Sequence, residues 1–175
     1  MALRPILVVG NIVLRQKAKR VSQFDRTLQR LIDDMIETMR AAPGVGLAGP
    51  QIGVPLRLAV IEVDDKITVI INPEIIKRSA ETELDEGCLS VPGYWGKLMR
   101  SEKVTVKARN REGREFRVSA EGLLGQALQH EIDHLDGMLY IDRMESLDNL
   151  QRSEPIRKAE AEARQKEAAS AREPE

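Results

Sequence analysis

The sequence predicts a single domain of the α+β class, and three observations carry this prediction. Apolar residues recur at helical spacing over residues 24–39, short runs rich in β-branched residues fill residues 56–118, and a second helical pattern covers residues 123–137. We expect the short runs to pair as antiparallel strands. The 175 residues suit one domain, and aromatic residues make up only 3% of them, so the core must be aliphatic.

The first helix is expected over residues 24–39, after a short apolar entry at residues 6–14. Asp25 can cap its N-terminus because a carboxylate accepts hydrogen bonds from the free N–H groups of the first turn. Pro43 and Gly44 end the helical pattern.

A glycine-rich segment, GVGLAGPQIG at residues 44–53, contains the G-x-G-x-x-G pattern of dinucleotide-binding loops. That pattern needs a strand before it and a helix after it, whereas a helix precedes it here and Pro50, Gly53 and Pro55 prevent an immediate helix. No Lys-Ser or Lys-Thr follows, which excludes a phosphate-binding loop. A loop that approaches a ligand closely, with the Gln51 amide as donor, and a simple tight turn both remain.

The β-branched runs follow, and we expect strands at residues 56–63, 67–71, 74–78, 103–110 and 115–118. Turn-forming pairs separate several of them: Asp64-Asp65, Asn72-Pro73 and Glu112-Gly113. Residues 83–100 are expected to lie between strands, with the only cysteine and an aromatic loop at residues 92–96. Residues 138–141 are expected to form a last strand.

The second helix is expected within residues 123–137. Ser119 is the expected N-cap, Glu121 suits the positive end of the helix dipole, and Gly137 can end the helix. Both histidines of the chain lie in this segment, in the pattern HEIDH at residues 130–134.

His130 and His134 are four residues apart, so a helix of about 3.6 residues per turn places both imidazoles on one face. They can bind one metal ion while Glu131, about 100° round the helix, leans towards it as a base. Catalytic sites of this kind need a third protein ligand, and the Cys88 thiolate is a candidate. A lone cysteine is more often a small buried hydrophobic residue.

Composition restricts the function classes. A net charge of −1 argues against a protein that coats nucleic acid phosphates, and a single cysteine suits a reducing compartment. We find no leader segment or apolar run long enough to span a membrane and expect a cytoplasmic protein. We expect a catalytic domain at residues 1–150 and a charged tail, helical or disordered, at residues 151–175, where six basic residues balance six acidic ones.

Three segments together resemble one family: GVGLAGPQ at residues 44–51, EGCLS at residues 86–90 and QHEIDH at residues 129–134. In this order and at these spacings the chain is similar to the peptide deformylases, over about residues 5–143. The resemblance implies antiparallel sheets packed around the central metal helix. It also implies a hydrolase that removes the formyl group from the N-terminal formyl-methionine of newly made proteins and releases formate.

The resemblance also implies roles for individual residues. Cys88, His130 and His134 would bind a divalent ion, typically Fe²⁺, with water as fourth ligand, although Zn²⁺, Ni²⁺ or Co²⁺ also suit these ligands. Glu131 would take a proton from the water and deliver it to the departing amine. Gln51 and the Leu89 N–H would stabilise the oxyanion.

The substrate-binding residues follow from the same resemblance. Gly46 would offer backbone hydrogen bonds to the peptide. The methionine side chain would lie against apolar walls formed by Val45, Leu84, Leu123 and Ala127.

The chain departs from the family pattern at several places. Gly49 stands where alanine is usual and is expected to loosen the loop, and Trp95 stands where many relatives carry arginine, so contacts beyond methionine should differ. The usual Asp-Pro pair is missing near residues 10–13. Some relatives have basic tails that dock on the ribosome, and the neutral tail here argues against such docking.

Two alternatives remain open. A zinc peptidase could use the same His-Glu-x-x-His helix with a downstream carboxylate as third ligand, for which Glu145 is the candidate. A purely structural metal site would need four protein ligands, and the sequence has no second cysteine or third histidine.

Overall fold

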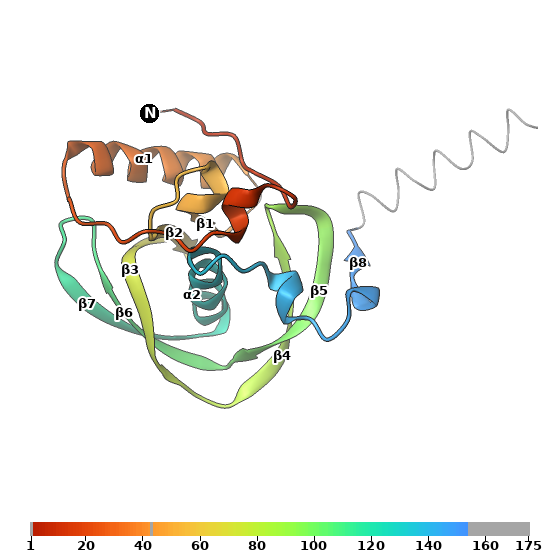
Figure 1. Cartoon of the computed structure of the whole chain (residues 1–175). Helices are drawn as coiled ribbons and strands as arrows, with labels where there is room; N and C mark the ends of the chain where they lie inside the picture. The colour runs from red at the N-terminus through yellow and green to blue at the C-terminus, as the bar shows by residue number, and fades with distance from the viewer. Residues whose placement is uncertain (1, 43, 154–175) are drawn as a thin grey trace, which may run out of the picture.

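A central helix, α2 (Gly122–Leu135), lies between two antiparallel sheets in the computed structural model, which describes residues 2–42 and 44–153 (Figure 1). One sheet has the order β1 (Gly46–Ala48), β2 (Leu58–Val63), β3 (Lys66–Arg78), β6 (Lys103–Arg109), β7 (Glu115–Glu121). The other has the order β4 (Glu81–Cys88), β5 (Val91–Ser101), β8 (Gln151–Arg152). The expected α+β class with antiparallel pairing is confirmed.

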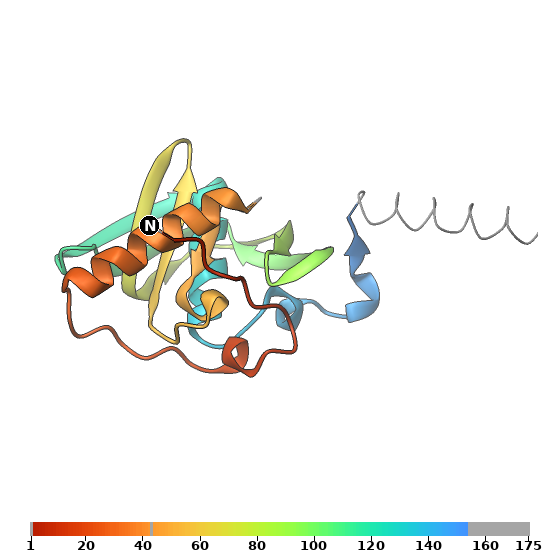
Figure 2. The ribbon, with the colours of Figure 1, turned by 90° about the horizontal axis from the view of Figure 1, so that it is seen from above.

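The N-terminal helix α1 (Arg26–Ala41) forms where the apolar spacing predicts it. The Asp25 side chain accepts a hydrogen bond from the Leu28 N–H at 2.9 Å, so the expected cap is present. The buried face of α1 packs on β1 and β2 (Figure 2). Helix α1 therefore covers the face of the sheet opposite α2.

Strand β2 is covered by an apolar cluster on each of its two faces. Leu58 and Val60 point into the apolar cluster with α1, whereas Ala59 and Ile61 point into the cluster with α2. Successive side chains of a strand alternate between faces, so a continuous apolar run suits a strand that is covered on both sides. The core is aliphatic as expected, and Tyr140 is the only aromatic residue among the largest fully buried side chains that the structure describes.

The turn expected at Asn72-Pro73 is wrong, because β3 continues through it as a single strand. The register with β6 shifts between Ile71 and Glu74, and Asn72 has a φ of 51°. The Asn72 amide donates to the Val21 carbonyl and accepts from the Val21 N–H, both at 2.9 Å. Asparagine tolerates this conformation, so the pair marks a bulge that holds the N-terminal segment.

The expectation that residues 83–100 lie between strands, with an aromatic loop at residues 92–96, is also wrong. Most of it is the β4–β5 hairpin, and the aromatic residues Tyr94 and Trp95 lie within β5. They pair with Arg152 and Gln151 of β8, two residues that the sequence assigned to the tail. The rest of the expected tail, from residue 154, lies outside the described residues.

The ends of α2 differ from expectation. Strand β7 runs on to Glu121, so Ser119 is no cap and its hydroxyl bonds that of Thr105 at 2.6 Å. Gly137 has a φ of 77° just after the helix and ends it as expected. The strand expected at residues 138–141 is wrong, because a 3-10 helix, η3 (Tyr140–Arg143), begins there.

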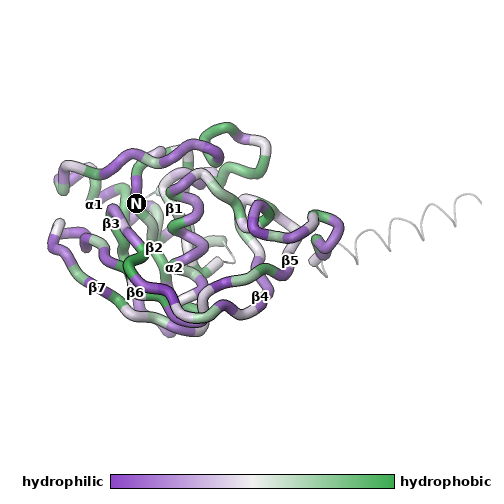
Figure 3. Tube along the Cα trace, turned by 60° about the horizontal axis from the view of Figure 1, so that its bottom comes forward, coloured by the Kyte–Doolittle hydropathy of each residue, from purple (hydrophilic) through white to green (hydrophobic). Residues whose placement is uncertain are grey.

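Hydrophilic residues recur along α2 although it lies in the middle of the molecule (Figure 3). Buried polar side chains cost free energy unless they find partners, so such a helix marks a site and not simple core packing. Among the described residues, no helix has the length and apolar character needed to cross a membrane.

Candidate metal centre

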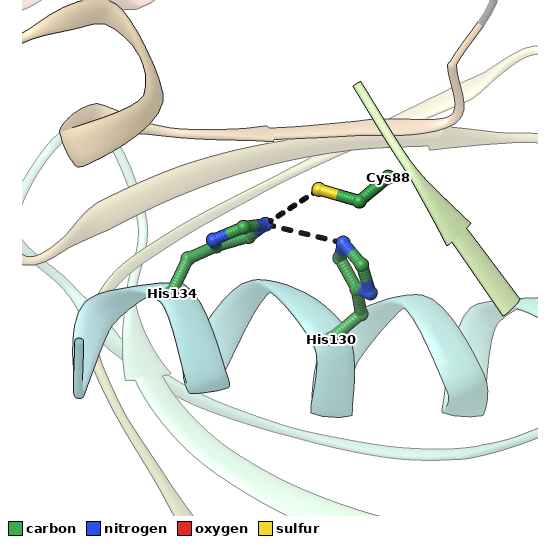
Figure 4. A group of neighbouring side chains, drawn as sticks. All are labelled: Cys88, His130 and His134. Atoms are coloured by element: carbon green, nitrogen blue, oxygen red, sulfur yellow. Dashed lines mark hydrogen bonds between the residues drawn. The ribbon is translucent and has the colours of Figure 1, made fainter. Parts of the chain in front are cut away.

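Helix α2 presents both imidazoles towards the end of β4 (Figure 4). The Nε2 atoms of His130 and His134 are 3.2 Å apart, and the Cys88 Sγ lies 3.2 Å from the His134 Nε2. One atom from each of the three side chains lies within 4.8 Å of the others. The spacing of four in the helix and the strand end together converge three metal-binding atoms on one point.

Cys88 is the last residue of β4, where the register of the hairpin shifts after Gly87. The Ser90 N–H donates to the Cys88 Sγ at 3.4 Å. The chain turns here, and this N–H helps to fix the sulfur towards α2.

Glu86 orients His130. Its Oε1 lies 2.5 Å from the His130 Nδ1, so Nδ1 carries the proton and Nε2 is left for the metal. Burial would raise the pKa of Glu86, but hydrogen bonds from His130 and Arg100 outweigh it and lower this pKa to about 2. Glu86 is therefore a carboxylate at neutral pH.

Glu131 is buried beside the metal-binding atoms. Burial raises its pKa to about 7, and the nearby Glu86 and Asp133 charges add to the rise, while His130 and Arg100 oppose it. Its Oε2 has no hydrogen-bond partner among the described residues, as expected of an atom that faces a bound water or substrate.

Gly46 makes room for Glu131. A methyl group at Gly46 would overlap the Glu131 carboxylate, so only glycine permits this approach of β1 to α2. The sequence indicated that the glycine-rich segment can approach a ligand closely, and in the structure Gly46 also closely approaches the Glu131 carboxylate.

Gln51 has a fixed amide orientation. Its Oε1 accepts the Ala48 N–H at 2.8 Å, while its Nε2 lies 3.2 Å from the Ser90 Oγ and 3.7 Å from the Cys88 Sγ. The donor end of the amide therefore faces the metal centre. The glycine-rich segment around it has a helix before it and only the four-residue 3-10 helix η2 (Gly49–Ile52) after it, which confirms that it is no dinucleotide loop.

Gly49 is buried, and a methyl group there would lie 2.8 Å from the carbonyl oxygens of Val54 and Leu56. These carbonyls enclose the position, and the expected looseness of the loop stays a prediction.

A cavity of about 650 Å³ opens beside the metal-binding atoms. Its lining includes four of the five expected substrate-binding residues and both expected oxyanion residues: Val45, Gly46, Leu123, Ala127, Gln51 and Leu89. Leu84 is not among these lining residues; it pairs with Leu98 across the β4–β5 hairpin, and its role as a wall for methionine stays a prediction. Trp95 does not line the cavity either.

Sequence reasoning missed Glu86 and Gln126. Glu86 lies two residues before Cys88, so strand periodicity puts both on the same face, and this was the available signal. The Gln126 amide donates to the Asp85 carbonyl at 2.8 Å and to Glu86 at 3.3 Å, which ties α2 to β4. No signal in the sequence connects a helix residue to a strand some forty positions away.

The geometry decides between the alternatives. Glu145 is exposed and belongs to no metal-binding group that the described residues form, which argues against the zinc peptidase arrangement. Three ligand atoms with an open cavity beside them suit a catalytic site, whereas a structural site would close with a fourth protein ligand.

Comparisons with known proteins agree with this chemistry. A family model described as polypeptide deformylase matches residues 3–150. The chain is 53% identical to the peptide deformylase of Dehalococcoides mccartyi over 152 residues, 86% of this chain and 91% of that protein. It is 51% identical to that of Heliobacterium modesticaldum, over 83% of this chain and 97% of that protein.

Solved structures give the same result. A peptide deformylase from Legionella pneumophila superposes with a TM-score of 0.82 at 46% identity, covering 99% of this chain and 100% of that one. A peptide deformylase from Synechococcus elongatus in complex with actinonin has a TM-score of 0.81 at 41% identity, covering 85% of this chain and 84% of that one.

Proposed function

The chain belongs to the peptide deformylase family, metal-dependent hydrolases that remove the formyl group from newly made peptides, and we propose that Cys88, His130 and His134 hold its metal ion. The convergence of these three side chains is the observation that carries the proposal. Their donors are one sulfur and two imidazole nitrogens, a set that suits a divalent transition metal.

We infer that the working ion is Fe²⁺, as the family resemblance implies. Zn²⁺, Ni²⁺ and Co²⁺ suit the same ligands, so purified protein can carry any of them. The ion, when bound, would supply a Lewis acid that lowers the pKa of a water molecule and polarises the formyl carbonyl.

Glu131 is the proposed proton carrier. Its Oε2 is buried and unpartnered among the described residues, so it can accept a proton from the attacking water. The same carboxyl then gives the proton to the amine nitrogen as the C–N bond breaks. Formate and a free N-terminal amine leave, and Glu131 returns to its starting state.

Two donors are proposed to stabilise the oxyanion that forms at the formyl carbon. The Gln51 Nε2 faces the centre because its Oε1 is held by the Ala48 N–H. The Leu89 N–H follows Cys88 directly, and Leu89 lines the same cavity. Donors that are fixed before the reaction stabilise developing charge without reorganising.

The methionine side chain is proposed to occupy the cavity against Val45, Leu123 and Ala127. Val45 and Leu123 are exposed apolar residues at 40% and 51%, and a bound apolar side chain would remove them from water. Strand β1 is an edge strand of its sheet, so the backbone at Gly46 can bond an extended peptide.

The protein acts on formylated nascent peptides, and we propose that it does so in the cytoplasm. We propose that any ribosome contact is transient and does not use the neutral tail at residues 151–175. A net charge of −1 argues against direct nucleic acid binding. We propose residues 1–150 as the catalytic unit.

The deciding experiment is to incubate metal-reconstituted protein with formyl-Met-Ala-Ser and to assay formate and peptide cleavage separately. The expected result is stoichiometric formate with an intact peptide chain. Cleavage of an internal peptide bond would contradict the proposal and support the peptidase alternative, and no formate from fully metal-loaded protein would exclude the assigned reaction.

A further inference from the structure

A line of alternating charges runs from the surface to the metal centre. Arg143 of η3 donates to Asp133 through Nε at 2.5 Å and through Nη2 at 2.6 Å. Arg100 of β5 donates to the same carboxylate at 2.6 Å and, with its other two nitrogens, to Glu86 at 2.5 and 3.0 Å. Glu86 in turn contacts the His130 Nδ1 at 2.5 Å.

Most of the charged side chains in this line are buried. The side chains of Arg100, Glu86 and Asp133 are only 2%, 4% and 8% exposed, whereas that of Arg143 is 33% exposed. Ionised groups in such surroundings are strongly destabilising unless they are paired and hydrogen-bonded. Each inner group has partners on both sides, and Arg143 is where the line ends at the surface.

The line joins elements that are far apart in the chain. Asp133 lies within the metal helix between the two histidines, Glu86 lies two residues from Cys88, and Arg143 lies in η3 beyond the end of α2. The same ionic contacts therefore connect both ligand-bearing elements, β4 and α2, to a segment that carries no ligand.

Resting on the proposed metal site, we propose that Arg143 and Asp133 are positioning residues that fix Glu86 through Arg100 and so keep the His130 Nε2 directed at the metal. A histidine ligand is oriented by the acceptor on its other ring nitrogen. The acceptor here is Glu86, and its position depends on the Arg100 guanidinium, which is planar and must satisfy two carboxylates at once.

Loss of Arg143 would shift the Arg100 side chain from Glu86 towards Asp133. The Asp133 Oδ1 would lose its donor, and Oδ2 would keep only Arg100. The buried Asp133 charge would then draw Arg100 towards it and away from Glu86. The resulting freedom of Glu86 lets the His130 ring rotate, and the metal should leave faster.

The test measures metal release and not activity. Full-length protein loaded with Zn²⁺ is mixed with an excess of a chromogenic chelator, and the release rate is followed for the wild type, Arg143→Met and Arg143→Lys. We expect Arg143→Met to release Zn²⁺ about tenfold faster or more. Replacing residues that hold metal ligands in place typically weakens metal binding by about 10- to 100-fold. Arg143→Lys keeps the charge but not the paired donors, so its rate should be intermediate.

Arg4→Met is the matched control. Arg4 also donates two hydrogen bonds to a nearly buried aspartate, Asp34, and is itself partly exposed, but the pair ties the N-terminus to α1 and does not reach the metal centre. Arg4→Met should release Zn²⁺ at the wild-type rate even if its melting temperature falls as far as that of Arg143→Met.

The results separate this inference from the metal assignment. If the wild type binds one Zn²⁺ and Arg143→Met releases it at the wild-type rate, the positioning role is wrong and the metal site stands. If Arg4→Met accelerates release equally, general destabilisation explains the effect and the inference is again wrong. A wild-type protein that binds no Zn²⁺ would contradict the metal site and the positioning role together.

Discussion

Glu131 and Glu86 are buried carboxyl groups in one site with opposite properties. Burial raises the pKa of Glu131 to about 7, whereas hydrogen bonds from His130 and Arg100 overcome burial and lower the pKa of Glu86 to about 2. A group that titrates near neutral pH can exchange a proton, and one that stays ionised can hold a neighbour in place. The two environments therefore support the roles proposed for the two residues.

Glu131→Gln should keep the metal and lose turnover. The amide has nearly the same shape but cannot accept and return a proton, so we expect a loss of about 10²-fold or more in kcat. Metal content and formate release should be measured on the same sample. Near-normal turnover by metal-loaded Glu131→Gln would exclude Glu131 as the proton carrier.

Gly46→Ala should displace Glu131 without touching a metal ligand. The added methyl overlaps the Glu131 carboxylate, which must turn away from the centre. Misplacement of a reacting group by about 1 Å can cost about 10²-fold, so kcat should fall on that scale while metal content stays at the wild-type value. Unchanged kcat would mean that the carboxylate position is not critical.

Among the individual site residues, the sequence predicts those whose positions depend on local spacing. His130, Glu131 and His134 follow from helix periodicity, and Cys88 was the only thiol available. Glu86 was missed because its partner His130 lies 44 residues away.

At the scale of the elements, Arg57 binds the C-terminal end of α2, the helix that carries both histidines. Arg57, just before β2, donates to the Leu135 carbonyl at 3.2 Å, to Asp136 at 2.7 Å and to the Pro73 carbonyl at 3.1 Å. A cation at the C-terminus of a helix satisfies free carbonyls and complements the helix dipole. Arg57 thus joins the end of α2 to the five-stranded sheet.

Arg57→Met should lower the free energy of unfolding. The side chain is 13% exposed, and its loss removes the donors to the Pro73 carbonyl and to Asp136, while the Leu135 carbonyl keeps its bond from the Ala18 N–H. Loss of such hydrogen bonds costs on the order of 1–3 kcal/mol. Arg40→Met is the control, because it removes an exposed ion pair with Glu62 and should change stability much less. Equal denaturation midpoints for the two variants would contradict this role for Arg57.

Helix α1 was predictable because its apolar spacing, its Asp25 cap and the turn residues after it all indicate a helix over nearly the same residues. The β4–β5 hairpin was not, because Gly87, Gly93 and Gly96 interrupt the local strand pattern and cross-strand pairing forms it nonetheless. Gly96 leaves space that the Met144 side chain fills, a contact that no local pattern reveals.

At the scale of the whole molecule, the N-terminal segment is bound to α1 by the Asp34 carboxylate and by the Thr38 hydroxyl, which accepts the Arg4 N–H at 3.0 Å. Asp34 accepts hydrogen bonds from the Arg4 side chain and the Ala2 N–H, both at 2.8 Å at closest. Hydrogen bonds from Arg4 and then from Ala2 lower the pKa of Asp34 from its ordinary value of 3.8. The folded state therefore favours the ionised form of Asp34.

This shift predicts a pH dependence. Because the pKa is lower in the folded state, the stabilisation is fully present above the unfolded pKa near 3.8 and is lost as pH falls through the folded pKa. Asp34→Asn should be less stable than the wild type at pH 7, and the difference should shrink as pH falls below 3.8. A difference in unfolding free energy that stays constant down that range would contradict the linkage.

The fold class and the order of motifs follow from the sequence because they depend on composition and periodicity. The arrangement of the two sheets about α2 does not, since it depends on contacts such as those of Asn72 with Val21 and of Gln126 with Asp85. Each contact joins residues more than forty positions apart, and only the folded chain shows it.

The most direct test of the central claim is a Co²⁺ titration followed by absorption spectroscopy. If Cys88, His130 and His134 hold one ion, the wild type and Glu131→Gln should each bind one Co²⁺ and show a sulfur-to-cobalt charge-transfer band. In Cys88→Ala the band should disappear and binding should weaken. A full-intensity band in Cys88→Ala, or one Co²⁺ bound as tightly as in the wild type, would contradict the assignment of the metal centre.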